Sequence, residues 1–156
     1  MGELSLNNEY RLAYPESFHV MDESERAQLR FLTEGDGDCI SDPENHILIS
    51  TGWKQAGKAV LFLLSPDDLA RQMQKAIAGS MKESGYQNSS LSKRTIAGMK
   101  SAGFRYSYTA EGIEMIGESF AFKDKKAVYY IHLFTRKTMA DENMKAWNSI
   151  LEGITK

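Results

Sequence analysis

The sequence is poor in the residues that cross-link small domains or hold metal ions. Cys39 is its only cysteine, which excludes an intramolecular disulfide and any zinc site built from cysteines. The three histidines, His19, His46 and His132, stand far apart, with no pair at the short spacing of metal ligands. We therefore expect no metal and no cofactor.

A basic excess and long apolar runs are also missing. The 19 Lys and Arg residues against 21 Asp and Glu residues give a net charge of −2, which argues against a general nucleic-acid-binding protein. The longest apolar run, residues 59–64, is far shorter than the roughly 20 residues that span a bilayer. Neither a basic nor an apolar signal region opens the sequence. We expect a cytoplasmic protein with no nucleic-acid and no membrane partner.

The composition that remains is that of one globular domain. Hydrophobic residues make up 42% and charged residues 26%. A chain of 156 residues is long enough for one hydrophobic core, and no internal repeat divides it. We expect residues 1–156 to form a single domain. Residues 33–45, which are acidic, and residues 85–93, which are rich in serine, resemble loops.

The first half of the chain predicts short strands. Residues 10–14 and 47–51 have strand composition, and Leu4 and Leu6 fit a short strand before them. Residues 22–31 have helical composition behind a possible cap at Asp22. Residues 59–64 fit either a strand or a helix.

A long helix follows. Ser65-Pro66-Asp67-Asp68 places a capping hydroxyl, a proline at the first helical position and two acidic side chains where helices favour them. Four apolar residues then recur every fourth position, which predicts one buried stripe and a helix that ends near Gly85. They are Leu69, Met73, Ile77 and Met81.

Four successive strands are expected in the second half, at residues 95–100, 104–109, 113–123 and 127–136. Both faces of the last of these are apolar or aromatic, which predicts a central strand covered on both sides. The third does not alternate cleanly, and we expect a bulge near Gly117.

The chain closes with a helix that Thr138 is expected to cap, with Asp141 at capping-box spacing. Its apolar stripe comprises Met144, Trp147, Ile150, Leu151 and Ile154. Strands grouped apart from helices indicate the α+β class with a mostly antiparallel sheet and helices on both faces.

Several segments resemble the PsbP-like superfamily, which includes the photosystem II protein PsbP, a Ran-binding nuclear import factor and the bacterial DcrB-type proteins. They are YRLAYPESF, KRTIAGMKSAGFRYSYTAEG, KKAVYYIHLFTR and MADENMKAWNSILEGIT. The resemblance implies an α-β-α sandwich that binds proteins rather than performing chemistry. It transfers no functional residue, and fold alone does not assign function.

Residue patterns that could carry chemistry have simpler interpretations. Cys39 with Asp42 and His46 suggests a thiol site, but the favoured reading is an unreactive thiol in an acidic loop, where carboxylates raise a thiol's pKa. The loop's five acidic residues could gather around calcium, but their spacing fails the EF-hand pattern. They are Glu34, Asp36, Asp38, Asp42 and Glu44.

Three further patterns also have structural explanations. Ser90 and Lys93 match Ser-x-x-Lys without its partner motifs. Tyr106 and Tyr108 faintly match an RNA-binding strand motif but fit a buried sheet face. Residues 123–126, with residues 136–137, are expected to form a basic end of the last hairpin, available to an acidic partner.

The leading functional hypothesis is a non-enzymatic domain that binds a protein or peptide on a sheet face or in a groove between helix and sheet. A homodimer is plausible on general grounds. The alternative is a small-molecule-binding protein or cryptic enzyme with a pocket near Trp53, Tyr130 and His132. A pocket with a perturbed histidine favours the alternative, whereas an exposed apolar patch favours the leading hypothesis.

Overall fold

The computed structural model describes residues 1–28 and 37–156. Its strands are β1 (Gly2–Leu6), β2 (Tyr10–Tyr14), β3 (His19–Val20), β4 (Cys39–Asp42), β5 (Ile47–Gln55), β6 (Gln87–Asn88), β7 (Ser92–Ile96), β8 (Met99–Ala110), β9 (Ile113–Lys123) and β10 (Ala127–Arg136). Its helices are α1 (Glu23–Gln28), α3 (Lys58–Leu63), α4 (Pro66–Ser80) and α5 (Ala140–Glu152), with 3₁₀ turns at Pro43–Asn45 and Lys137–Met139.

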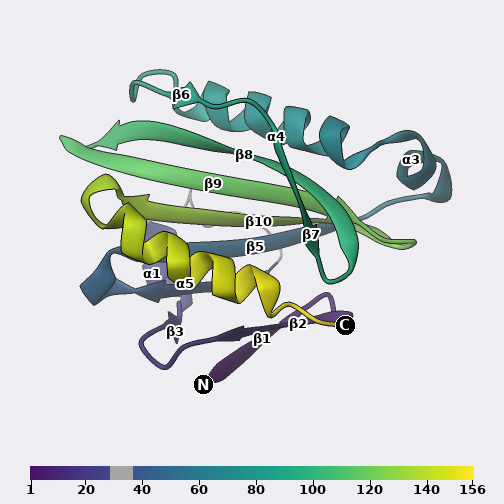
Figure 1. Ribbon diagram of the computed structural model, residues 1–156, viewed down its shortest axis with the longest axis horizontal. Helices are drawn as coiled ribbons and strands as arrows, with labels where there is room; N and C mark the ends of the chain where they lie inside the picture. Colours follow the sequence, from purple (N-terminus) through teal and green to yellow (C-terminus); the bar gives the residue numbers. More distant parts are fainter. Residues whose placement is uncertain (29–36) are drawn as a thin grey trace.

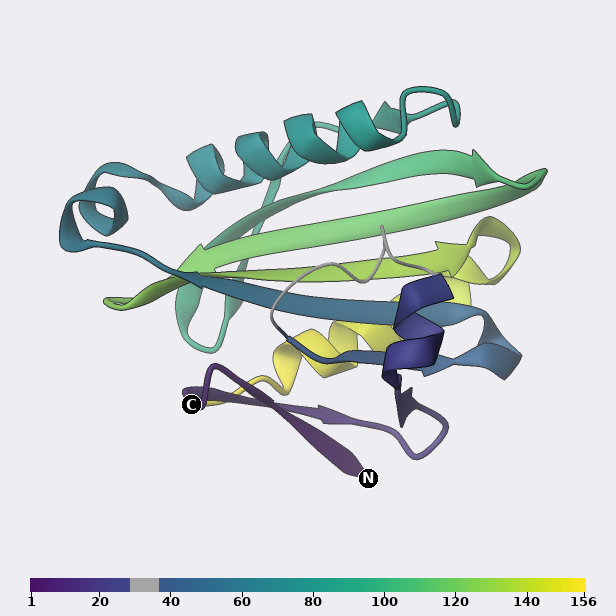
Figure 2. The same cartoon turned by 180° about the vertical axis from the view of Figure 1, so that it is seen from behind.

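Within the described residues, one antiparallel sheet of eight strands forms the middle layer (Figure 1). Its order is β3-β4-β5-β10-β9-β8-β6, and β7 also pairs with β8. Helix α4 packs on β8 and β9 on one face, whereas α5 and the β1–β2 hairpin cover the other. The view from behind shows α1 beside β5, on the face opposite α5 (Figure 2). The α+β class and the α-β-α sandwich are therefore confirmed.

Strand β10 separates two hydrophobic cores. Its side chains alternate, so Tyr129, Ile131 and Leu133 enter the core under α5, while Val128 and Phe134 enter the core under α4. It pairs with β5 on one side and β9 on the other, which makes it the central strand that its doubly apolar sequence predicted.

The start of α4 follows from its own sequence. The Ser65 hydroxyl accepts a hydrogen bond from the Asp68 backbone N–H, and the Asp68 carboxylate accepts one from the Ser65 N–H. This reciprocal capping box confirms the expected start. The predicted start of α5 is wrong, because Thr138 lies in the 3₁₀ turn Lys137–Met139 and the helix has no side-chain cap.

Two predictions for the strands in the second half are also wrong. The pair Ala102-Gly103 does not interrupt a strand but lies inside β8, and the turn falls earlier, at Ala97-Gly98. The pairing of β9 with β8 and β10 runs through Gly117 without a bulge. The Tyr106 ring lies where a Cβ of residue 117 would stand, so close packing explains this glycine.

The first half of the chain departs from its predicted elements at residues 33–45. The expected loop at residues 33–45 contains strand β4, whose four residues are all buried; residues 33–36 lie outside the described part. Asp22 caps α1 through the Glu25 N–H, and the rest of the predicted helix beyond Gln28 also lies outside it. Residues 59–64 are largely helical, in α3. Among the described residues, no helix has the length and apolarity needed to cross a membrane.

Candidate functional site

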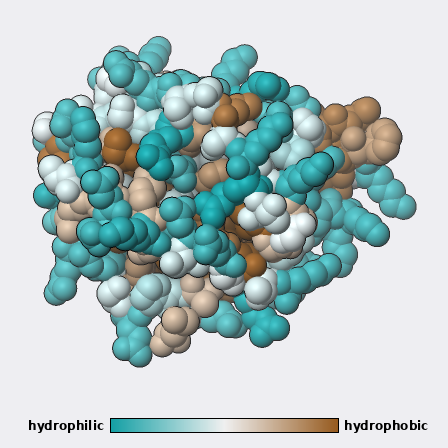
Figure 3. All heavy atoms as spheres, viewed as in Figure 1, coloured by the Kyte–Doolittle hydropathy of each residue, from teal (hydrophilic) through white to brown (hydrophobic). Residues whose placement is uncertain are grey.

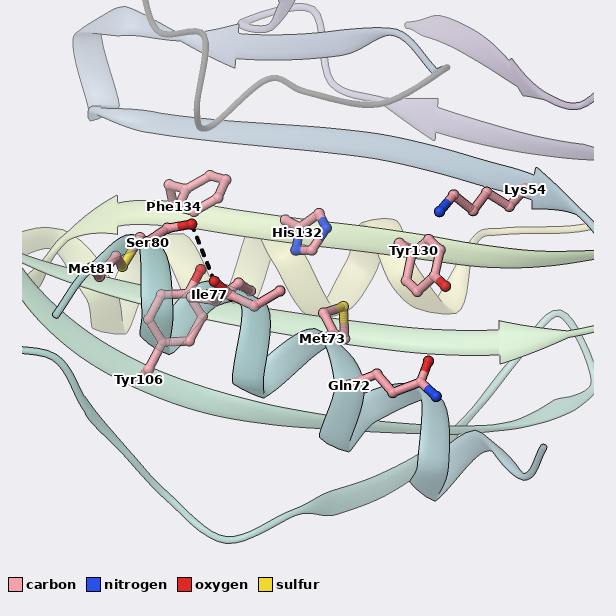
Figure 4. A pocket seen from close by; sticks show the side chains of 11 residues that line it. Lys54, Gln72, Met73, Ile77, Ser80, Met81, Tyr106, Tyr130, His132 and Phe134 are labelled. Atoms are coloured by element: carbon pink, nitrogen blue, oxygen red, sulfur yellow. Dashed lines mark hydrogen bonds between the residues drawn. The ribbon is translucent and has the colours of Figure 1, made fainter.

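A cavity of about 390 Å³ lies between α4 and the sheet (Figure 4). Helix α4 contributes one wall through Met73 and Ile77, on the stripe that its four-residue repeat predicted. The sheet contributes the facing wall, chiefly from β10. The remaining lining residues are Lys54, Gln72, Ala76, Ser80, Met81, Tyr106, Tyr130, His132 and Phe134.

Tyr130, His132 and Phe134 alternate along β10, so all three point to the α4 side of the sheet. Figure 4 shows their side chains facing α4 across the cavity. Helix α4 packs mainly against β8 and β9, which leaves Tyr130 and His132 partly uncovered, whereas Phe134 is buried. The cavity therefore exists because the helix covers only part of this face.

His132 is the lining residue whose shifted pKa decides its charge in mild acid. Its Nδ1 lies 2.6 Å from the hydroxyl of Ser119, the residue opposite it on β9. Removal from water lowers the pKa of His132 to about 4, so the ring is neutral at pH 7. The described residues make no hydrogen bond to Nε2, which leaves that nitrogen for a ligand.

Other polar groups are few and separated. Tyr106 is almost completely buried. Its hydroxyl lies near Ser119 but makes no hydrogen bond of normal geometry within the described residues, and burial raises its pKa. Partial burial raises the pKa of Tyr130. Lys54 is exposed on β5, and its side chain reaches the cavity rim. The cavity thus joins an apolar interior to a cation at its edge.

Trp53 does not join Tyr130 and His132. Lys54 and Trp53 are neighbours on β5, so their side chains point to opposite faces of the sheet. Trp53 pairs with Tyr129 across the strands and packs against the core under α5. The sequence-based grouping brought together two cavity residues and one residue from the other side of the sheet.

The sequence does not predict which α4 residues line the cavity. Its four-residue repeat predicts Met73, Ile77 and Met81 as a buried stripe, but a stripe does not reveal where packing leaves a space. Gln72, Ala76 and Ser80 lie beside that stripe and carry no signal of their own.

The suggested thiol site is not assembled. Cys39 is fully buried in β4 opposite Ser50, whereas His46 lies beyond the far end of that strand, roughly 10 Å away at about 3.3 Å per residue. Burial, more than the nearby Asp38 carboxylate, raises the pKa of the Cys39 thiol. Asp42 accepts hydrogen bonds from Asn45. The expected acidic-loop setting of Cys39 is wrong, because the thiol belongs to a buried strand.

Two other sequence patterns have clear structural outcomes. Tyr106 and Tyr108 are buried in the α4-side core, as their alternation predicted. The basic end of the last hairpin is wrong, because residues 123–126 and 136–137 lie at opposite ends of β10, about 30 Å apart. No group of metal-ligating side chains occurs among the described residues; Glu34 and Asp36 of the suggested calcium loop lie outside them.

Comparison with known proteins supports the fold. No protein-family model and no curated protein matches the chain. The solved structure of LpqN, involved in cell envelope biogenesis of Mycobacterium tuberculosis, is 18% identical over 94% of this chain and 82% of its own, with a TM-score of 0.63. CyanoP, the PsbP of the cyanobacterium Synechocystis sp. PCC 6803, is 12% identical over 98% and 90%, with a TM-score of 0.72.

A protein of unknown function from Pseudomonas aeruginosa, PA94, is 16% identical over 98% of this chain and 94% of its own, with a TM-score of 0.50. At these identities the likeness concerns the fold alone. The chain has a PsbP-like fold, and the sequence resemblance to that superfamily is confirmed at this level.

Proposed function

We propose that the chain is a non-catalytic binding domain whose cavity between α4 and β10 holds a small amphipathic molecule. One observation carries this proposal: an apolar cavity with a neutral histidine in its wall and a lysine at its rim. Ligand pockets usually measure about 300–1,000 Å³ and combine apolar walls with a few polar groups. The volume of about 390 Å³ fits a compact ligand.

The lining suggests how such a ligand is held. Its apolar part packs against Met73, Ile77 and Phe134, and the flexible methionine adapts to its shape. Nε2 of the neutral His132 ring forms one hydrogen bond with the ligand, as donor or acceptor according to the ring's tautomer, and adds no charge. Lys54 at the rim pairs with an acidic group that stays near water.

The same groups favour binding over catalysis. The described lining contains neither a carboxylate nor a thiol. A histidine with a pKa of about 4 is a weak general base near neutral pH, where an effective base has a pKa close to the operating pH. Ser119, the only hydroxyl bonded to His132 in the described residues, is fully buried and out of a ligand's reach.

Binding of a peptide or protein segment is the second candidate, and a second hollow favours it. This hollow, about 570 Å³, shares Phe134 with the first and extends to Met115 and Arg136. An extended peptide along β10 would place alternate side chains in the two hollows. Its polar backbone would lie at the rim.

A fluorescent probe tests the proposed cavity. We expect 1-anilinonaphthalene-8-sulfonate to bind with enhanced emission and decanoate to displace it. Ala76→Trp, which fills the cavity mouth, should weaken probe binding at least tenfold, whereas Lys75→Trp, on the neighbouring exposed position, should not. Equal binding by both variants would contradict the assignment of the site.

Native mass spectrometry then separates the two candidates. An extra mass of a few hundred daltons on the purified chain supports a small ligand. Displacement of the probe by peptides but not by decanoate supports the second candidate. The same spectrum reports whether the expected homodimer forms.

A further inference from the structure

We infer that the tip of α3 inserts into the surface of membranes that carry anionic lipids. The α3 tip consists of Val60, Phe62 and Leu63, whose exposed fractions are 45%, 86% and 73%. Figure 3 shows an apolar projection at the end of the molecule where Figure 1 places α3. Clustered exposure of large apolar side chains marks an interaction site, whereas single exposed residues need no explanation.

Several contacts hold α3 in place and keep its tip exposed. Leu61, on the inner side of α3, is buried in the core under α4. The Lys123 ammonium, at the end of β9, donates a hydrogen bond to the Leu61 carbonyl. The backbone N–H of Leu64 donates to the Val60 carbonyl and closes the last turn. These contacts fix α3 to the domain, so Phe62 and Leu63 project as a consequence of the fold.

The charges around the tip favour an anionic surface. Lys54 precedes α3, Lys58 begins it, and Lys125 lies in the neighbouring β9–β10 turn; all three are exposed and have no ion-pair partner among the described residues. Positions 45–66 contain no acidic residue, while Asp67 and Asp68 begin α4 and Asp124 adjoins Lys125. Phenylalanine and leucine insert into the interface of a bilayer, and neighbouring lysines are attracted to its anionic lipids.

The shape of the tip favours a bilayer over a protein partner or a second copy of the chain. A stable protein interface usually buries about 800 Å² on each partner, and lysine is depleted there. Three side chains on a six-residue projection offer only a narrow wedge, with lysines nearby. A bilayer accepts such a wedge between headgroups, and this contact needs no spanning helix. The inference therefore departs from the expectation of no membrane partner, which rested on the absence of a spanning run.

Vesicle co-sedimentation of the whole chain tests this inference independently of any cavity ligand. We expect binding to vesicles of 70% phosphatidylcholine and 30% phosphatidylglycerol, and much weaker binding to phosphatidylcholine alone. The double variant Phe62→Ser/Leu63→Ser should lower the partition coefficient at least tenfold. Lys58→Gln and Lys125→Gln should each lower it about fivefold, and 0.5 M NaCl should have a similar effect.

A matched control and a direct probe make the result specific. Ile113→Ser removes an apolar side chain of 39% exposure at the start of β9 and should leave vesicle binding unchanged. Phe62→Trp should show a blue-shifted emission with anionic vesicles. Absence of binding to both vesicle types, or equal binding by the double variant, would overturn the inference. If the double variant instead loses a chemical cross-link to a second polypeptide, the tip is a protein contact.

Discussion

The desolvated imidazole of His132 predicts a specific loss of stability in mild acid. Its pKa is about 4 in the folded chain, against 6.5 for an unperturbed histidine. The unfolded chain therefore binds the proton more tightly than the folded chain. This contribution to stability is complete above pH 6.5 and is lost as the pH falls toward 4.

The expected magnitude follows from these two pKa values. Between pH 7.5 and 5.0 the unfolded histidine becomes almost fully protonated, whereas the folded one stays almost neutral. The folding equilibrium shifts roughly 30-fold, so this residue lowers the free energy of unfolding by about 2 kcal/mol. The endpoint of pH 5.0 stays above the range where carboxylates with lowered pKa, such as Asp124, lose their stabilising effect.

Urea unfolding followed by tryptophan fluorescence measures this loss. The free energy of unfolding should fall about 2 kcal/mol more in the natural chain than in His132→Gln over this pH interval. Glutamine keeps a polar group toward Ser119 but does not titrate. His19 and His46 are present in both proteins, so any contribution they make is common to both. Equal pH dependence in the two proteins would refute the assignment of a desolvated, neutral His132.

Three substitutions test the packing by urea unfolding. Gly117→Ala should cost about 2–3 kcal/mol, because its Cβ would overlap the buried Tyr106 ring; no change would mean that the ring can move. Gly79→Ala should stabilise α4 by about 0.5–1 kcal/mol, since its Cβ meets open space; destabilisation would contradict this. Trp147→Phe should cost about 1–3 kcal/mol by removing the indole donor to the buried Glu118 carboxylate, and a neutral result would show that water replaces it.

The candidate site was only partly accessible from the sequence. Alternation along one strand is enough to place Tyr130 and His132 on the same face, because successive side chains point to opposite sides. It does not reveal whether Trp53 on β5 lies on the same face of the sheet as His132 on β10. That depends on the register in which the two strands pair, and they are far apart in the chain. The register, with Tyr129 opposite Trp53 and Tyr130 opposite Gly52, puts Trp53 on the other side.

The exposed α3 tip was equally hidden. Residues 59–64 form the most apolar run of the chain, which ordinarily indicates burial. Only Leu61 reaches the core, because the short helix ends before α4 and lies at the margin of the sheet. Periodicity describes one element, whereas exposure depends on what the rest of the fold places against it.

Short stretches of sequence specify the local features of this protein: the capping box of α4, the buried stripe of α5 and the doubly apolar central strand β10. Each depends on residues within a few positions of one another, so short-range hydrogen bonding and side-chain period suffice. Three other features are visible only in the folded chain: the pairing of β5 with β10, the cavity that α4 leaves beside β10, and the outward projection of the α3 tip. These outcomes depend on packing between segments far apart in the chain, where the total buried surface selects one arrangement.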